Sequence, residues 1–147
     1  MSYNQIDKNI YLGGILPTQD PEFLKKIDII IDMVDYHGLH TPKYPPRILY
    51  YHFPIDDLSN QNIRQYFDKT YKLIDYAVTN NKNIYIHCMA GISRSSTILI
   101  AYYMKKYCIP LNQAMKMVSD RRNIIQPNPG FIEQLKDYEK YVINILC

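Results

Sequence analysis

Residues 83–97 have the sequence NIYIHCMAGISRSST. Residues 84–86 (Ile-Tyr-Ile) form a short apolar run of β-branched and aromatic side chains, which is typical of a buried strand. The apolar segment 98–104 (ILIAYYM), which follows directly, favours a buried helix. The sequence therefore predicts a strand and a helix that are joined by a short loop over residues 88–94.

The composition of the 88–94 loop is that of an anion-binding site. A loop that enters a helix N-terminus presents backbone N–H groups, and the helix dipole adds positive potential. Cys88 begins the loop, Gly91 lies in its middle and Arg94 ends it. In this setting Cys88 is expected as a thiolate nucleophile, and the planar fork of Arg94 can hold two phosphate oxygens. The alternative, an ordinary buried cysteine, leaves Gly91 and Arg94 unexplained.

The spacing of these residues also resembles a known family. His87 and Cys88, then five residues, then Arg94 and Ser95 resemble the His-Cys-x5-Arg-Ser/Thr motif of the cysteine-dependent protein tyrosine phosphatases. The inner residues 90–95 (AGISRS) resemble the dual-specificity branch most closely. This motif is specific because it sets several residue types at fixed spacing, between a strand and a helix.

The resemblance covers nearly the whole chain. Residues 10–13, 101–104 and 122–131 are similar to the family's opening strand, to the helix after its loop, and to its penultimate loop. The family fold is a central, mostly parallel sheet flanked by helices, and the order of predicted elements agrees with it. We therefore expect one α/β catalytic domain over residues 1–147, with the protein tyrosine phosphatase-like fold of the dual-specificity type.

The individual elements follow from hydrophobic periodicity and from the positions of glycine and proline. We expect strands over 10–13, 29–34, 48–53 and 84–86, with Pro54 stopping the third, and helices over 20–26, 63–78, 95–107, 111–121 and 129–145. A ligand should then bind outside the carboxyl ends of the strands, where Cys88 lies.

Composition and charge narrow the function further. The chain has 147 residues, is 47% hydrophobic and carries a net charge of +3, so we expect one folded, monomeric domain without nucleic-acid partners. Without a membrane span, membrane anchor or secretory pattern, a cytoplasmic location is expected, with nuclear entry by diffusion. Three cysteines argue against a disulfide framework. We expect Cys108 to be structural and Cys147 to be a free thiol.

Cleavage of a phosphate monoester expels an oxyanion that needs a proton, so a carboxylic acid should stand near the leaving oxygen. Asp56 and Asp57 are adjacent candidates in a polar loop. Alignment with the family favours Asp57, and Asp56 is the runner-up. The other carboxylate would be a solvated loop residue or a helix cap.

The resemblance implies a phosphatase mechanism. Cys88 attacks phosphorus to form a phosphocysteine, Asp57 protonates the leaving group and then activates water, and Ser95 hydrogen-bonds the departing sulfur. The phosphate is bound by Arg94 and by backbone N–H groups of Met89, Ala90, Gly91, Ile92, Ser93 and Arg94. No metal or cofactor is expected, because these groups supply the positive charge.

Other polar residues have two possible roles each. His87 points away from the nucleophile along the strand, so it either orders the loop and keeps Cys88 ionised, as the resemblance implies, or is a hydrogen-bonded core histidine. Asn128 either braces the catalytic loop or caps the last helix. Arg121 and Arg122 are expected as cations at a helix end, and the alternative is that one of them contacts a second phosphate or an acidic face of the substrate.

The loop composition bears on the substrate. Met89 and Ile92 occupy variable positions where phosphatases that resemble the phosphoinositide branch carry lysine, and this argues for a phosphorylated protein. The resemblance implies hydrolysis of phosphotyrosine and of phosphoserine or phosphothreonine. The alternatives are a phosphatase of another ester, such as a phosphoinositide or an RNA 5′-phosphate, and a catalytically weak module that binds phosphate.

Overall fold

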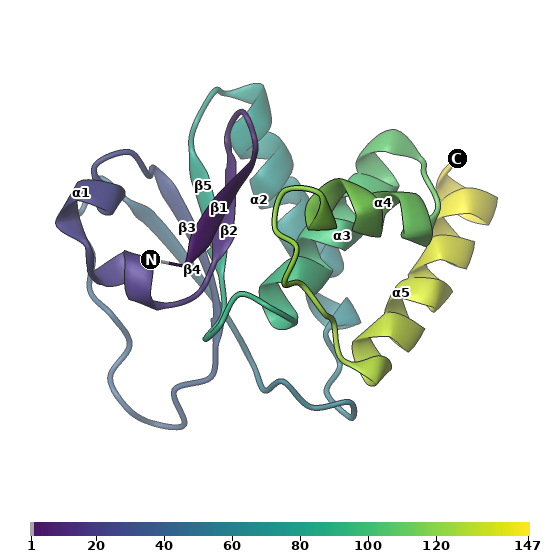
Figure 1. Ribbon diagram of the computed structural model, residues 1–147, viewed down its shortest axis with the longest axis horizontal. Coiled ribbons are helices and arrows are strands. Elements are labelled where there is room, and N and C mark those ends of the chain that lie inside the picture. Colours follow the sequence, from purple (N-terminus) through teal and green to yellow (C-terminus); the bar gives the residue numbers. More distant parts are fainter. Residues whose placement is uncertain (1) are drawn as a thin grey trace.

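The computed structural model describes residues 2–147 and has one five-stranded sheet with helices on both sides (Figure 1). The strands are β1 (Tyr3–Asp7), β2 (Ile10–Gly13), β3 (Ile29–Val34), β4 (Leu49–Ile55) and β5 (Ile84–His87). The helices are α1 (Pro21–Leu24), α2 (Phe67–Thr79), α3 (Arg94–Tyr107), α4 (Leu111–Ser119) and α5 (Pro129–Tyr141). Short 3-10 segments lie at Leu16–Gln19 and Arg64–Tyr66, and a π-helical turn covers Val142–Leu146.

The predicted strand at residues 84–86 is the centre of the sheet. The strand order is β1-β2-β5-β3-β4, and β5 runs parallel to both β2 and β3. Strand β4 is also parallel to β3, and only β1 is antiparallel to its neighbour. This confirms the expected α/β fold with a central, mostly parallel sheet.

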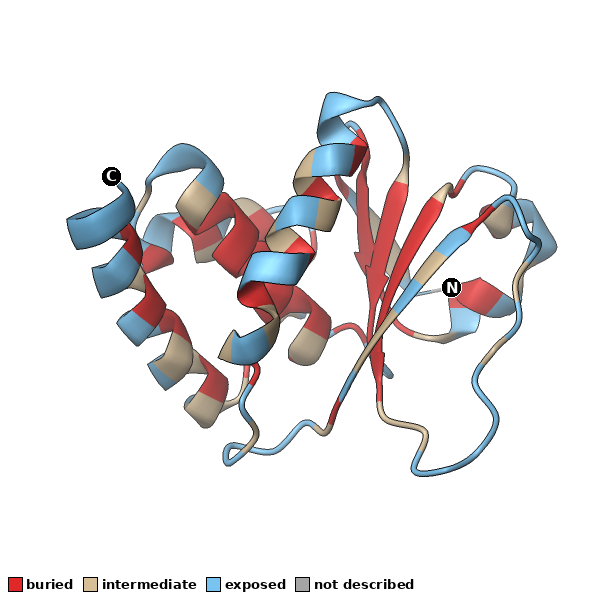
Figure 2. Ribbon diagram, turned by 180° about the vertical axis from the view of Figure 1, so that it is seen from behind, coloured by how far each residue is buried: buried red, intermediate tan, exposed pale blue. Residues whose placement is uncertain are grey.

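The alternation of side chains along the central strands supplies two cores. Ile84 and Ile86 of β5 pack in the larger cluster, on the side covered by α2 to α5. Tyr85, between them, packs in the smaller cluster with Phe23 of the short α1. The strands β3 and β5 are buried along their whole length, as Figure 2 shows by colour. Burial on both faces explains the continuous apolar runs of these strands.

The structure corrects two predicted boundaries. Strand β4 does not stop before Pro54 but continues to Ile55, which is tolerated because β4 is an edge strand where a missing N–H leaves no ladder partner unpaired. The last helix is α-helical only to Tyr141, and its final turn is π-helical. Strand β1 was not predicted, because its sequence YNQID lacks an apolar pattern and it forms by pairing with β2.

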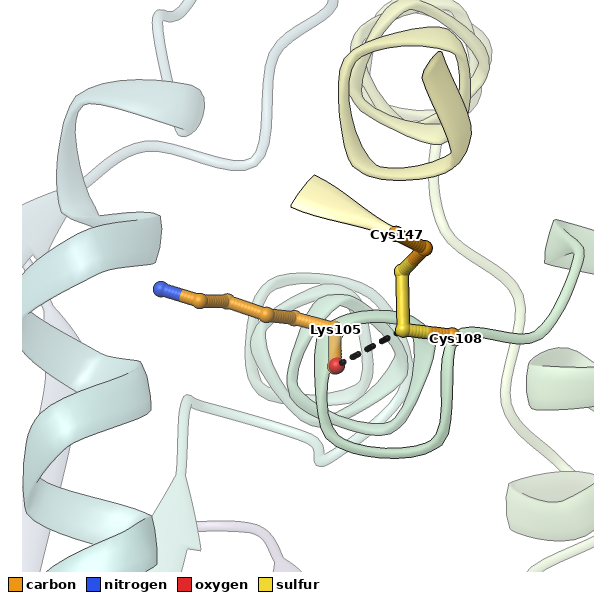
Figure 3. Close-up of a disulfide and its surroundings, with 3 residues drawn as sticks. All are labelled: Lys105, Cys108 and Cys147. Carbon is orange, nitrogen blue, oxygen red and sulfur yellow. Dashed lines mark hydrogen bonds between the residues drawn. A yellow bond between two sulfur atoms is a disulfide. The ribbon is translucent and has the colours of Figure 1, made fainter. Parts of the chain in front are cut away.

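Cys108 and Cys147 form a disulfide (Figure 3), so the expectation of a free thiol at Cys147 is wrong. Cys108 ends α3 with a positive φ of 51°, and the C-terminal turn brings Cys147 to a Cα–Cα distance of 6.1 Å. Thirty-nine positions separate the two residues, so only the tertiary packing of α3 against the C-terminal turn reveals the pairing.

Within residues 2–147, no helix is both long enough and apolar enough to cross a membrane. The loop that follows β5 lies at the carboxyl end of the sheet, where it enters α3. In open α/β folds, ligands bind at this carboxyl end of the parallel strands.

The disulfide closes a loop of about forty residues, so its loss is expected to lower the free energy of unfolding by about 2–4 kcal/mol. The Cys147→Ser variant should show this loss in urea denaturation under non-reducing conditions. The two proteins should have equal stability once a reductant opens the disulfide of the wild type. Equal stability without reductant would mean that the cross-link contributes nothing.

Candidate active site

The backbone of the 88–94 loop is held from outside through its carbonyl oxygens. The carbonyls of residues 89–92 accept hydrogen bonds from Ile15 N (3.0 Å to residue 89), from Arg122 (3.1 and 2.8 Å to residues 90 and 91) and from Gln126 N (2.8 Å to residue 92). A trans peptide points its N–H opposite to its C=O. The N–H groups of residues 90–93 are therefore directed to the inner side of the loop, where Gly91 N donates to Cys88 Sγ at 3.3 Å.

Gly91 is required by this geometry. Its φ is +69°, in the left-handed region that favours glycine. An added Cβ would also collide with the backbone of Gly13 at the end of β2. The turn that aims the N–H groups inward therefore depends on the absence of a side chain at Gly91.

Cys88 lies at the end of β5, 2% exposed, and is the cysteine outside the disulfide. Its sulfur is 3.2 Å from the hydroxyl oxygen of Ser95, in the first turn of α3. The predicted nucleophile and its predicted hydrogen-bond partner are thus neighbours. Together with the N–H of Gly91, Ser95 surrounds the sulfur with polar groups.

Arg94 begins α3 and reaches across the site. One terminal guanidinium nitrogen donates to the carbonyl of Ile55 at 2.9 Å, which fixes the side chain against the end of β4. The buried Nε of Arg94 has no hydrogen-bond partner among residues 2–147. A buried unpaired donor is costly, so this group is suited to an anionic ligand.

Ser93, the N-cap residue of α3, does not cap the helix with its own side chain. Its hydroxyl instead accepts from the backbone N–H of Asn128 at 2.9 Å. The first N–H groups of α3 are therefore left without a capping side chain from Ser93. A helix N-terminus in this state is a ready binding site for phosphate.

Asn128 caps α5 with its side chain, whereas its contact with the 88–94 loop is made by its backbone N–H. Its side-chain oxygen accepts from Phe131 N at 2.9 Å and caps α5. Its side-chain nitrogen donates to Asp57 Oδ1, also at 2.9 Å. Since the backbone of Asn128 is bound to Ser93, this residue connects Asp57 with the 88–94 loop.

Asp56 and Asp57 point to different partners. Asp56 Oδ1 lies 2.8 Å from His37 Nε2, in a half-buried to exposed group that includes Asp35. The possible ligand atoms of these three residues lie within 4.8 Å of one another, and this is the cluster among residues 2–147 that could hold a metal ion. Asp56 thus faces His37 in the connection between β3 and β4, whereas Asp57 faces Asn128 at the start of α5. The two carboxylates are therefore not equivalent.

His87 is fully buried beneath the loop, on the strand face opposite to the nucleophile's position. Its Nδ1 lies 3.1 Å from the carbonyl oxygen of Cys88, and a carbonyl only accepts, so Nδ1 carries the proton. Burial lowers the pKa of His87, and the buried carboxylate of Asp32, 3.6 Å from Nε2, opposes that shift. This environment suits a residue that orders the loop, and here the two predicted roles of His87 coincide.

Arg122 is the residue that sequence analysis misjudged. Arg121 is exposed at the end of a helix as predicted, but Arg122 is only 3% exposed. Besides the loop carbonyls, its guanidinium donates to Asn4 Oδ1 at 2.8 Å and to Ser2 Oγ at 2.7 Å. It thus binds the 88–94 loop to the N-terminal segment. Two adjacent arginines give no sequence signal that separates a buried brace from an exposed cation.

Comparison with known proteins relates nearly the whole chain to one family. Residues 10–141 match the family model for the catalytic domain of dual specificity phosphatases. Dual specificity protein phosphatase 1B of Arabidopsis thaliana is 34% identical, over 95% of this chain and 83% of the relative. Dual specificity protein phosphatase 1 of the same plant is also 34% identical, over 92% of this chain and 68% of the relative.

Solved structures resemble the whole fold. The crystal structure of DUSP15 superposes with a TM-score of 0.85 at 29% identity and covers 93% of this chain and 86% of that one. The human tyrosine phosphatase-like serine/threonine/tyrosine-interacting protein superposes with a TM-score of 0.83 at 29% identity, over 93% and 95% of the two chains.

The bracing role of Arg122 leads to a test with a matched control. Arg122→Lys keeps the charge but cannot contact both loop carbonyls and the N-terminal segment. The affinity of the loop for tungstate, an oxyanion used here as a probe in place of phosphate, should therefore fall about tenfold or more. Isothermal titration calorimetry measures this, with circular dichroism to check folding. Arg121→Lys, which changes an exposed neighbour, should bind tungstate as the wild type does. A folded Arg122→Lys protein with unchanged affinity would refute the brace.

Proposed function

The chain belongs to the dual specificity phosphatase family and is a phosphoric monoester hydrolase, and we propose that its Cys88 removes phosphate from phosphotyrosine and from phosphoserine or phosphothreonine in proteins. Family relatives are named protein phosphatases, and the phosphocysteine route is general for the family. The residue roles that follow are assigned to this chain on the basis of its own geometry.

The observation that carries the proposal is the direction of the loop N–H groups. Because the carbonyls of residues 89–92 are bound from outside, the N–H groups of residues 90–93 surround the space above the Cys88 sulfur. The unpaired Nε of Arg94 adds a charged donor. Donors arranged before the substrate arrives stabilise the charge of a transferring phosphoryl group without reorganisation.

The reaction proceeds in two displacements. The thiolate of Cys88 attacks phosphorus in line, the S–P bond forms, and the P–O bond to the substrate breaks while Asp57 donates its proton to the leaving oxygen. The resulting carboxylate of Asp57 then takes a proton from water, which attacks phosphorus and releases Cys88 and inorganic phosphate. Ser95, at 3.2 Å from the sulfur, stabilises the departing thiolate by donating a hydrogen bond.

Asp57 is preferred to Asp56 as the acid because of its partners. Asn128 binds Asp57 and is itself bound to Ser93 of the loop, so the carboxyl group is held beside the phosphate site. A second restraint lies nearby, because a side chain at Gly130 would collide with the backbone of Ser59. This close contact of the α5 start with the acid-bearing segment supports a fixed position for Asp57.

We propose a phosphorylated protein as substrate because Met89 and Ile92, which project from the loop, carry no charge for a phosphoinositide head group. We place the protein in the cytoplasm as a monomer, with entry to the nucleus by diffusion. In that reducing compartment the disulfide between Cys108 and Cys147 would be open to reduction. Cys108 lies at the end of α3 opposite to Arg94, so the redox state of the pair would leave the loop contacts unchanged.

The thiolate mechanism is tested with a small aryl phosphate in the presence of a chelator. Cys88→Ser should lose measurable turnover and keep tungstate binding, because the serine hydroxyl is a much weaker nucleophile and the loop donors remain. Cys147→Ser is the control and should keep its activity. A panel of phosphotyrosine, phosphothreonine and phosphoinositide substrates then identifies the substrate class. A wild type that binds phosphopeptides without turnover would instead be a binding module.

The acid assignment is tested by comparing two adjacent positions. Asp57→Asn should lower kcat/KM, which reports the first displacement, by about 10²–10⁴-fold for an alkyl phosphate, whose leaving group needs the proton, and much less for an aryl phosphate with a good leaving group. Asp56→Asn, which removes only the charge that faces His37, should stay within a few-fold of wild type on both substrates. A larger loss in Asp56→Asn would transfer the role to Asp56.

A further inference from the structure

An apolar groove lies beside the 88–94 loop. It has a volume of about 320 Å³ and is formed by the Leu16–Gln19 segment, by the loop itself and by the connection between α4 and α5. Its main apolar side chains are Leu16, Met89, Ile92 and Ile124, of which Leu16 is 60%, Met89 51% and Ile124 49% exposed. Several large apolar side chains exposed together mark an interaction site.

The walls of the groove are preformed. The wall that carries Leu16 is joined to the loop by the hydrogen bond from Ile15 N to Met89 O (3.0 Å). The wall that carries Ile124 is joined to it by the bond from Gln126 N to Ile92 O (2.8 Å). The same two bonds orient the loop N–H groups. The groove and the phosphate site therefore share one framework.

We infer that this groove binds an aliphatic side chain of the protein substrate, from a residue that neighbours the phosphorylated one in the sequence. The inference rests on the proposed function and extends it to the choice of substrate. Met89 and Ile92 line the groove and belong to the loop whose N–H groups would bind the phosphate, so a chain anchored by its phosphate above Cys88 has the groove within reach of its neighbouring side chains. The groove thus extends the surface on which this protein would bind its substrate.

The side chains that line the groove favour an aliphatic side chain over a charged group. No charged side chain lines the groove, and Ser2 is the polar residue at its border. An acidic residue, a second phosphate or a nucleotide would find no cation there, whereas leucine, isoleucine or methionine would bury apolar surface. A flexible peptide can place such a side chain into the groove while the phosphorylated residue occupies the loop.

The test uses phosphopeptides that differ at one position. A peptide with serine at every position around the phosphorylated residue is compared with peptides that carry one leucine at each of the three preceding and three following positions. In the wild type, kcat/KM should rise about tenfold for leucine at one of these positions, because the side chain is buried on binding. The preferred position identifies the direction in which the peptide crosses the groove.

Variants of the groove then test the site. In Leu16→Asp and Ile124→Asp, kcat/KM for the leucine peptide should fall to within about twofold of kcat/KM for the serine peptide. In at least one of these variants, a peptide with lysine at the same position should become the preferred substrate. Leu39→Asp changes a residue that is 76% exposed and outside the groove, and it should keep the leucine preference. A folding defect lowers kcat/KM for all peptides alike, so it cannot change which peptide a variant prefers.

Specific outcomes would overturn the inference. Equal kcat/KM for leucine and serine at all six positions would show that the groove takes no substrate side chain, and so would a leucine preference that survives in both groove variants. If the variants instead impair hydrolysis of a phosphoinositide in phosphatidylcholine vesicles, the groove holds an acyl chain. A wild type that hydrolyses aryl phosphate but no phosphopeptide would overturn the proposed substrate class itself.

Discussion

The site depends on the hydrogen bonds that hold the carbonyl oxygens of the 88–94 loop outward. Peptide planarity converts this restraint into inward N–H groups, so the anion site is formed from the back of the loop rather than from within it. Arg122 supplies two of these bonds and also binds Asn4 and Ser2. The N-terminal segment, the end of β2 and the connection after α4 therefore all contribute to the loop, although none of them carries a reacting group.

The acid side of the site is attached to the same framework. Arg94 binds the carbonyl of Ile55, and Asn128 joins Asp57 to the loop through Ser93. Asn128 also caps α5, so the stability of the last helix and the position of the proposed acid are coupled through one side chain. Segments that are far apart in the sequence thus meet at the carboxyl end of the sheet, which allows a short chain to hold the proposed nucleophile, anion site and acid together.

Features determined by neighbouring residues were predictable from the sequence. The strand, loop and helix around Cys88 follow from local patterns, and the parallel sheet follows from the order of the elements. Features that depend on tertiary contacts were not predictable. The polar strand β1 forms by pairing with β2, Arg122 is buried by segments distant in sequence, and Cys147 meets Cys108 through the packing of the C-terminal turn near α3. Asp56 and Asp57 are the same residue type, so only their contacts in the fold, with His37 and with Asn128, distinguish their roles.

The extension of β4 through Pro54 has a consequence for assembly. β4 lies at the edge of the sheet and exposes Leu49 and Tyr51, so another chain could add a strand there. Pro54 lacks an N–H donor and interrupts the ladder that such a strand would need. Pro54 thus opposes the addition of a strand along β4 and, with it, aggregation through this edge of the sheet.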